Sequence, residues 1–537
     1  MALIAPAPRL RRGFRFSADP APLGALAALV CILPILALVA LAATGGGDTL
    51  RHLAETRLLA YLRNSAALAI LVAIGVSLLG VPTAWLTARY RFPGRGVFVW
   101  ALALPLAAPT YVLAYAWASL VNAGGPLYGL LPPLRGVAGA AFIFSIALYP
   151  YVYLLARQAF EGGAAHALDA ARTLGAGPWR AFWRVGLPLA RPALAAGMAL
   201  AIMETLADYG AVEYLGAPTF TTGIVRAWIS LGDPAGAARL AVILLLATLL
   251  ALGVERRARG AGRVADPRGR ARPQERQPLA PHFAVLAVAG CAAPILIGLL
   301  IPAARLIWLA METPPVRPVL PAFLNTAGLS LAAALIAAAL GLGAATAALS
   351  GGKLARAAAR LAQLGYAIPG AVAAIGVLAL LGGLQRVLDA SLAGFAPLVA
   401  GGGLVALVFA YQSRFAAAAI GPSESALLRV TPSLEAAART LGETRMGVLR
   451  RVHLPLAAGG VATAALIVFV EVMKELPATM ILRPLDFETL AVVAHNYAAD
   501  ERLGQAARPS LLLIALGLPA MIAVSRLVSG GRKSPAR

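Results

Sequence analysis

Charged residues are scarce in this 537-residue sequence: Asp, Glu, Lys and Arg make up only 13%, whereas 60% of the residues are apolar. A soluble chain of this length needs a charged surface that this composition cannot supply. Long apolar runs recur instead, for example Ala21–Ala43, Ser65–Ala88 and Phe283–Ala310. Such runs match the roughly 20 residues that a helix needs to cross a bilayer, where helices satisfy their own backbone polar groups. The composition therefore excludes a soluble protein and predicts an all-α polytopic membrane protein.

Cysteine and lysine are almost missing. Cys31 and Cys291 each lie inside an apolar run, so the sequence indicates no disulfide framework and no thiolate metal site. None of the three lysines stands in a G-x-x-x-x-G-K-[ST] phosphate-binding loop. The five histidines lack His-x-x-x-His spacing, and no nucleophile elbow is present. We therefore predict no catalytic residue, no cofactor, no metal site and no ATPase site within this chain.

About twelve membrane spans are expected. They lie approximately at 21–43, 65–88, 98–120, 137–157, 192–212, 237–254, 281–309, 323–349, 357–382, 394–418, 457–477 and 508–528. The net charge of +23 is typical of basic residues retained on the cytoplasmic side of a membrane protein, and we do not expect nucleic acid as a partner. The basic N-terminal arm and the even number of spans predict that both termini are cytoplasmic.

The chain is predicted to contain two homologous six-helix repeats, residues 1–254 and 281–537, joined by a flexible cytoplasmic linker at 255–280 that is rich in Arg, Pro and Gly. The clearest match aligns 167–189 with 433–456 at an offset of 267 residues, and internal repeats of this size favour two bundles around a shared path. The same offset pairs Gly175 with Gly442, Pro188 with Pro455, Glu204 with Glu471, Asp208 with Glu475, Phe220 with Phe487, and Thr222 with Thr489. Earlier pairs shift slightly, to Asn64 with Asn325 and Pro109 with Pro369.

Each repeat contains one conspicuous cytoplasmic segment, at 166–189 and at 433–456. In each, a short helix of small residues ends at a Gly, which tolerates the backbone angles of a helix C-terminus, and a Leu-Pro pair follows before the next span. Small side chains allow a partner to approach closely, so both segments are predicted docking sites; the alternative is an interfacial hairpin that anchors the bundle. The predicted docking residues are Asp169, Ala170, Ala171, Gly175, Leu187 and Pro188, and Glu435, Ala437, Ala438, Gly442, Leu454 and Pro455.

These segments resemble the EAA loop of the membrane subunits of binding-protein-dependent ABC importers. Asp169 replaces the usual Glu in the first copy, and Glu435 stands one place early in the second. The resemblance implies the type I ABC importer permease fold and a location in the bacterial inner membrane. It also implies two ATPase subunits on the cytoplasmic face, which would hydrolyse ATP, and an extracytoplasmic substrate-binding protein.

Two pairs of acidic residues stand within the predicted spans: Glu204 with Asp208, and Glu471 with Glu475. Acidic groups are costly inside a membrane and are functional candidates by default. Residues four apart share one face of a helix, so each pair predicts an acidic stripe, and two facing stripes would form a path for a hard cation. Lys474, whose counterpart is Ala207, is expected to neutralise Glu471 or Glu475. Alternatively, these carboxylates cap the spans or lock the two halves together.

The stretches around these acidic pairs, ETLADYGAVEYLG and VEVMKELPAT, are similar to those of ferric-iron importer permeases, which are often fused two-repeat chains. The resemblance implies that iron passes from an external binding protein into the permease. A thiamine permease has the same fused architecture and is the main alternative. An ion-coupled secondary transporter is a more remote alternative, because such a carrier has no ATPase to dock on the two repeated loops.

Overall fold

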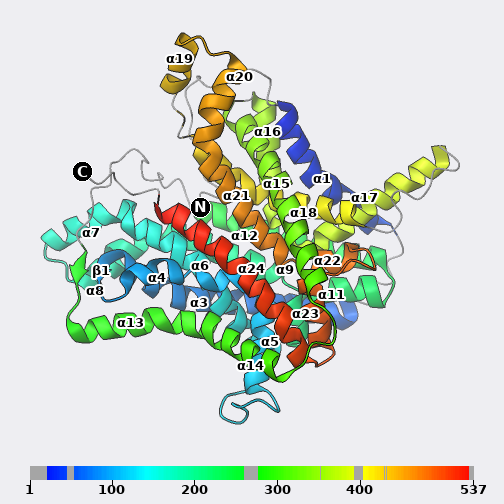
Figure 1. Ribbon diagram of the computed structural model, residues 1–537, viewed down its shortest axis with the longest axis horizontal. Helices are drawn as coiled ribbons and strands as arrows, with labels where there is room; N and C mark the ends of the chain where they lie inside the picture. The colour runs from blue at the N-terminus through cyan, green and yellow to red at the C-terminus, as the bar shows by residue number, and fades with distance from the viewer. Residues whose placement is uncertain are drawn as a thin grey trace.

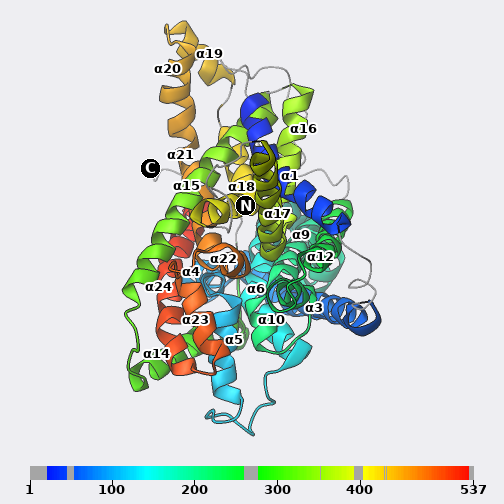
Figure 2. The ribbon, with the colours of Figure 1, turned by 90° about the vertical axis from the view of Figure 1, so that its right-hand side faces the viewer.

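Long helices in two interlocked bundles make up the protein, as the computed structural model shows (Figures 1 and 2). The structure describes residues 21–44, 54–258, 276–350, 352–391, 403–428, 430 and 432–530. The basic N-terminal arm, most of the predicted linker and the last seven residues lie outside the described residues, so the predictions made for them stay predictions.

The first half contains one short strand, the long helices and several single helical turns (η). Its elements are α1 (Ala21–Ala43), η1 (Ala54–Leu58), α3 (Leu59–Arg89), β1 (Tyr90–Arg91), α4 (Arg95–Ala101), η2 (Leu104–Ala107), α5 (Thr110–Val121), α6 (Gly136–Glu161), α7 (Gly163–Thr173), α8 (Pro178–Ala181), η3 (Phe182–Gly186), α9 (Leu187–Ala207), α10 (Gly210–Tyr214), α11 (Phe220–Val225), η4 (Arg226–Ser230) and α12 (Pro234–Ala258).

The second half has a similar order of long helices from α15 onward, but its strand comes before its first helix. Its elements are β2 (Gln277–Pro278), α13 (Pro281–Ile295), η5 (Leu296–Leu300), α14 (Ile301–Glu312), α15 (Leu320–Ser350), α16 (Lys353–Ala362), η6 (Gln363–Ala367), α17 (Gly370–Ser391), α18 (Leu404–Leu427), α19 (Pro432–Thr440), α20 (Arg445–Val448), η7 (Leu449–His453), α21 (Leu454–Met473), α22 (Pro477–Leu482), α23 (Leu490–Ala499) and α24 (Leu503–Gly530).

The membrane-spanning helices agree in number with the prediction. Eleven helices among the described residues are long and apolar enough to cross a membrane, and one bent pair brings the number to twelve. The bent pair corrects the continuous span predicted at 98–120, because its two parts meet at 91°. Ala108 is extended just before Pro109, as a residue preceding proline prefers to be. Ile368 is extended before Pro369 in the same way.

Equivalent backbone hydrogen bonds show the duplication directly. Gly136 N–H donates to the Leu215 carbonyl at 2.7 Å, and Gly403 N–H donates to the Leu482 carbonyl at 3.0 Å. Both residues of the second bond lie 267 positions after those of the first. The offset predicted from the sequence therefore holds in the fold from α6 and α18 to the ends of α10 and α22.

Beyond those helices the predicted register is wrong by three residues. Phe220 N–H donates to Ser65 Oγ at 3.3 Å, whereas the equivalent bond in the second half runs from Leu490 N–H to Thr326 Oγ1 at 2.8 Å. Phe220 therefore corresponds to Leu490 rather than to Phe487, and Thr222 does not correspond to Thr489. The cause is an insertion: seven residues separate Leu482 from Leu490, whereas four separate the equivalent Leu215 from Phe220.

The first helix of each half packs on the other half. Helix α1 lies against α15, α16 and α17, and α13 and α14 lie against α3, α4 and α5. The approach is close enough that a Cβ at Gly376 would stand 2.5 Å from the Pro34 carbonyl oxygen. Because each half covers part of the other, the two repeats form one interlocked unit around their shared interface.

Both ends of the predicted linker are ordered. Helix α12 continues to Ala258, beyond the predicted boundary at residue 254. Strand β2 pairs in parallel with β1, with Tyr90 opposite Gln277. Residues on both sides of the predicted linker's centre are therefore structured, and Gln277 is held against the loop that follows α3.

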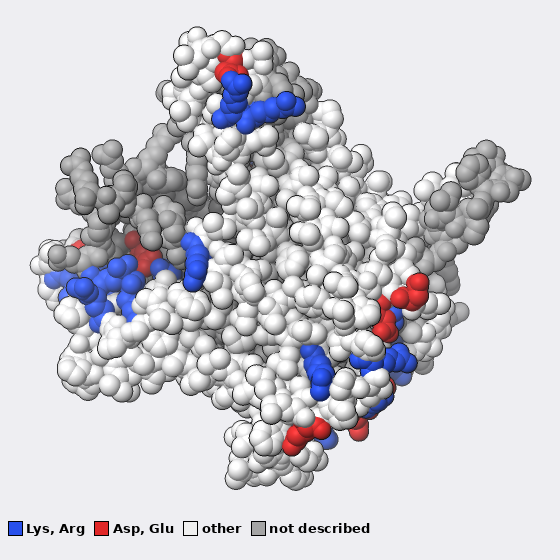
Figure 3. Space-filling view, in the orientation of Figure 1, with Lys and Arg blue, Asp and Glu red and all other residues white. Residues whose placement is uncertain are grey.

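The outer surface is that of a membrane protein. Ile74 on α3 and Leu335 on α15 point outward, with 52% and 60% of their surface exposed. On the face seen in Figure 3, basic side chains gather over α7 and α8 at the left and over α19 and α20 at the top. A broad uncharged band separates them from mixed acidic and basic side chains at the lower right. An uncharged band is what contact with lipid hydrocarbon requires.

Candidate substrate pathway and docking loops

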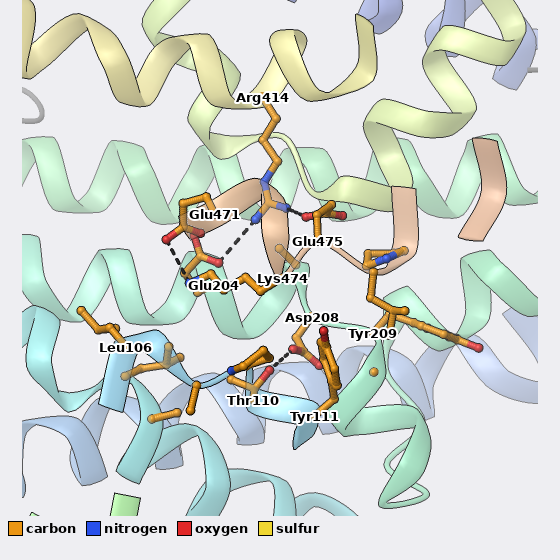
Figure 4. A pocket seen from close by; sticks show the side chains of 18 residues that line it. Leu106, Thr110, Tyr111, Glu204, Asp208, Tyr209, Arg414, Glu471, Lys474 and Glu475 are labelled. Carbon is orange, nitrogen blue, oxygen red and sulfur yellow. Dashed lines mark hydrogen bonds and ion pairs between the residues drawn. The ribbon is translucent and has the colours of Figure 1, made fainter. Parts of the chain in front are cut away.

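A pocket lined by residues of both halves lies between the two repeats. Figure 4 shows its charged side chains converging from α9, α18 and α21 and from the turns that follow α9 and α21. All four predicted path carboxylates line this pocket, together with two cations. The six charged residues of the lining are Glu204, Asp208, Arg414, Glu471, Lys474 and Glu475.

The two residues of each acidic pair do not share one helix face as predicted, because each long helix ends between them. Helix α9 ends at Ala207 and Asp208 is extended, with ψ 140°; α21 ends at Met473, before Glu475. Asp208 Oδ1 accepts Ala211 N–H at 2.9 Å, and Glu475 Oε1 accepts Ala478 N–H at 3.2 Å. These two carboxylates therefore satisfy free backbone donors at the start of α10 and α22, whereas Glu204 and Glu471 remain on the long helices.

The capping carboxylates have different neighbours in the two repeats. Thr110 Oγ1, at the start of α5, donates a short hydrogen bond to Asp208 Oδ2. Gly370 starts α17 at the equivalent place, where an added Cβ would stand 2.1 Å from Glu475 Oε1. The longer glutamate side chain therefore fills space that Thr110 occupies in the first repeat.

Two cations neutralise part of the acidic lining. Lys474 Nζ lies 3.0 Å from Glu471 Oε1, one of the two pairings predicted. Arg414 Nη1 donates to Glu475 Oε2, and Arg414 Nη2 lies 3.4 Å from Glu204 Oε2. The predicted residues did not include Arg414, although an arginine inside the predicted span 394–418 is the kind of costly charge that marks a functional position.

The charges of the pocket are unequally divided between the repeats. Four carboxylates face two cations, which leaves an excess of two negative charges when all six groups are ionised. Both cations come from the second repeat. Ala147 and Ala207, 267 positions before Arg414 and Lys474, also line the pocket. Within the described residues, no three His, Cys, Asp or Glu side chains are arranged to hold a metal ion.

The predicted docking segments share one helix-ending motif. Gly175 and Gly442 have φ of +84° and +85°, which glycine adopts without strain. After α7, Gly175 N–H donates to the Arg172 carbonyl at 2.9 Å and Ala176 N–H to the Ala171 carbonyl at 3.0 Å. The same two bonds follow α19, at 3.0 and 3.1 Å. This is the Schellman arrangement, and it confirms that each glycine ends its helix.

The ends of the two docking segments expose equivalent apolar side chains. Leu174 and Leu441, each just before the glycine, have 87% and 85% of their surface exposed. Of the predicted docking residues, Ala170, Ala437, Leu454 and Pro455 are exposed, while Ala171, Ala438, Leu187 and Pro188 are half-buried. The two exposed leucines thus stand at equivalent positions of the two copies.

The acidic residues of the docking segments differ between the copies. Asp169 is half-exposed and forms an ion pair with Arg89 at the end of α3, with 2.7 Å between Asp169 Oδ1 and Arg89 Nη2. Glu435 lies on α19, but its side chain is outside the described residues. The α7–α8 segment lies along the left edge of the body, whereas α19 and α20 project from the top (Figure 1).

Comparison with known proteins matches both halves to one family. The family of binding-protein-dependent transport system inner membrane components matches residues 78–259 and 337–530, more than half of the chain. The chain belongs to this family. It is 26% identical over 479 residues to the Fe(3+)-transport system permease protein FbpB 2 of Haemophilus influenzae, covering 88% of this chain and 90% of that protein.

Two further relatives match about a third of the chain. The molybdenum transport system permease protein ModB of Escherichia coli is 32% identical over 185 residues, covering 32% of this chain and 81% of that protein. The sulfate transport system permease protein CysT of Escherichia coli is 34% identical over 187 residues, covering 32% and 66%. The chain is thus a permease subunit of an ABC importer with two type I repeats, a multi-span protein of a bacterial inner-membrane family whose members are not themselves enzymes.

Proposed function

We propose that the chain passes ferric iron from an extracytoplasmic binding protein into the cytoplasm through the pocket between its repeats. The observation that carries the proposal is that four carboxyl side chains and only two cations line the pocket: Glu204, Asp208, Glu471 and Glu475, with Arg414 and Lys474. Carboxylate oxygens are hard ligands and suit a hard cation. The 26% identity to an Fe(3+) permease over most of both chains supports the same cargo.

Two ATPase subunits dock on the segments that follow α6 and α18, one at each. The matching motifs at Gly175 and Gly442 and the exposed Leu174 and Leu441 support this arrangement. ATP hydrolysis in those subunits moves the docked segments and shifts the permease between its outward-open and inward-open states. The docking segments and both chain termini then face the cytoplasm, in line with the basic side chains gathered over α7, α8, α19 and α20.

The molybdenum and sulfate permeases among the relatives raise an oxyanion as a different cargo. An oxyanion would meet the excess negative charge of the pocket, and like charges brought together cost free energy. Thiamine, an organic cation, fits the sign of the charge, and it is therefore the second candidate. Neither carboxylate pair needs a proton gradient in this mechanism, since ATP supplies the energy.

Reconstitution in liposomes with the partner ATPase and binding protein tests this function. We expect ATP-dependent uptake of Fe(III), and of Ga(III) as a redox-inert substitute, with no uptake of molybdate, sulfate or thiamine. Uptake of thiamine alone, or of an oxyanion alone, would contradict the proposed cargo. Uptake that persists without ATP and follows an ion gradient would contradict the whole mechanism.

A further inference from the structure

Arg414 joins the two repeats inside the pocket. From α18 its Nη1 donates to Glu475 of its own repeat, and its Nη2 reaches 3.4 Å across the interface to Glu204 on α9. Only 7% of its side chain is exposed. The face of Phe415 lies 4.8 Å from the guanidinium carbon, a favourable position for a cation.

The two contacts of Arg414 differ in kind. Helix α18 packs on α21 and α22, which flank Glu475, so Arg414 and Glu475 belong to one packed unit. Glu204 belongs to the opposite repeat and its contact with Arg414 is the longer one. If the repeats separate during transport, the contact that breaks first is therefore the one between Arg414 and Glu204.

Glu204 is held entirely by groups of the second repeat in the contacts that the structure shows. Its Oε1 accepts a hydrogen bond of 3.1 Å from the Tyr366 hydroxyl, and its Oε2 faces Arg414. Both oxygens that could bind a passing cation are thus already engaged. The position equivalent to Arg414 is Ala147, which offers no competing charge.

We propose that Arg414 is a specificity-determining residue: a tethered cation that holds Glu204 while the pathway is empty and that the cargo must displace. This inference rests on the proposed function only in taking the cargo to be a cation. At equal distance a trivalent ion interacts with a carboxylate three times as strongly as a single positive charge does. A monovalent ion attracts the Glu204 carboxylate no more strongly than the guanidinium does, and it does not replace the guanidinium's hydrogen bond. Na⁺ and K⁺ therefore do not displace Arg414 and are excluded.

The test measures ATP hydrolysis and ²²Na⁺ flux in liposomes that contain this chain and its partner ATPase, with and without Fe(III)-loaded binding protein. In Arg414→Gln, hydrolysis without loaded binding protein rises about 5- to 150-fold, the range of typical coupling between sites, and Na⁺ enters. Glu204→Gln removes the same contact from the side of the first repeat and keeps the Arg414–Glu475 pair. We expect it to give the same rise in ATP hydrolysis and the same entry of Na⁺, which together we call uncoupling. The double variant Arg414→Gln/Glu204→Gln should hydrolyse ATP and admit Na⁺ no faster than either single variant, because both substitutions remove one shared contact.

Arg305→Gln is the matched control. Arg305 on α14 also joins the repeats, through bonds of 3.1 Å from Nε to Ser119 Oγ and from Nη2 to the Ser119 carbonyl, and no carboxylate takes part in them. We expect this variant to hydrolyse ATP and to exclude Na⁺ as the unmodified chain does. Equal uncoupling in Arg305→Gln would show general loosening of the interface and overturn the proposal.

Unchanged hydrolysis in Glu204→Gln overturns the proposal as well, even if Arg414→Gln fails to assemble. Arg414→Lys keeps the charge but loses the second hydrogen-bonding arm, and it should give an intermediate effect. The test of Arg414 is separate from the test of the cargo. If iron is not the cargo, the unmodified chain will not take up Fe(III). The role of Arg414 is instead measured as ATP hydrolysis and Na⁺ flux without cargo.

Discussion

The two repeats agree in backbone and differ in charge. The bond from Gly136 to Leu215 recurs 267 positions later from Gly403 to Leu482. At the pocket, however, the first repeat has Ala147 and Ala207 where the second has Arg414 and Lys474. The two repeats therefore share the scaffold and the four acidic positions, but both cations belong to the second repeat, so the charge of the pocket is unequally divided between them.

The largest expected effect comes from the equivalent carboxylates Asp208 and Glu475. Glu475→Ala leaves Arg414 buried without its main partner, which costs about 3–5 kcal/mol. Asp208→Ala removes hydrogen bonds from Thr110 and Ala211 N–H, a loss of about 1–3 kcal/mol. Thermal unfolding of the detergent-purified complex measures both. Equal destabilisation by the two substitutions would show that the charge asymmetry has no energetic consequence.

The duplication, the number of spans and the helix-ending glycines were predictable because each leaves a local pattern. Gly175 and Gly442 stand in matching sequence, and a positive φ at a helix end favours glycine. The acidic positions were predictable for a different reason: Glu204 and Glu471 interrupt apolar runs, where charge is costly. These features depend on neighbours in the sequence, so no tertiary information was needed to find them.

Contacts between distant segments were not predictable. Arg414 meets Glu204 across 210 residues of sequence, and nothing near either residue indicates the other. The prediction of two acidic stripes was wrong because it assumed that each helix continues through its acidic pair. Helices α9 and α21 end within the pairs, and Asp208 and Glu475 cap the short helices that follow. The bend at Pro109 and the longer loop before α23 likewise came from turn geometry, which apolar periodicity does not reveal.

The docking segments should respond alike, because their motif is the same in both repeats. No heavy atom lies within 4 Å of a Cβ added at Gly175 or Gly442, so a substitution there is opposed by backbone strain alone. We expect Gly175→Val and Gly442→Val each to cost about 1–2 kcal/mol locally and to weaken co-purification of the partner ATPase. Membrane insertion should stay intact. Loss of the ATPase from only one of the two variants would show that the docking segments are not equivalent.

A smaller effect is expected from exchanging charge between the repeats. Ala207→Lys reduces the excess negative charge of the pocket from two to one, whereas Lys474→Ala raises it to three. We expect Ala207→Lys to lower Fe(III) uptake by about tenfold, since one unit charge at about 10 Å from a trivalent ion changes its energy by roughly 1.2 kcal/mol even at the dielectric constant of water, about 80. Lys474→Ala should keep uptake at or above its original level. Uptake that rises in Ala207→Lys would contradict the electrostatic account.

The most direct test of the pathway is ATP-driven Fe(III) uptake by the double variant Glu204→Gln/Glu471→Gln in liposomes that contain the partner ATPase and the binding protein. The substitutions keep side-chain size and remove one carboxylate from each repeat. Glu312→Gln, an exposed change at the end of α14, is the control. We predict that the double variant loses Fe(III) uptake while it still assembles with the ATPase, and that the control transports normally. Normal uptake by the double variant would contradict the claim that the inter-repeat carboxylates carry the cargo.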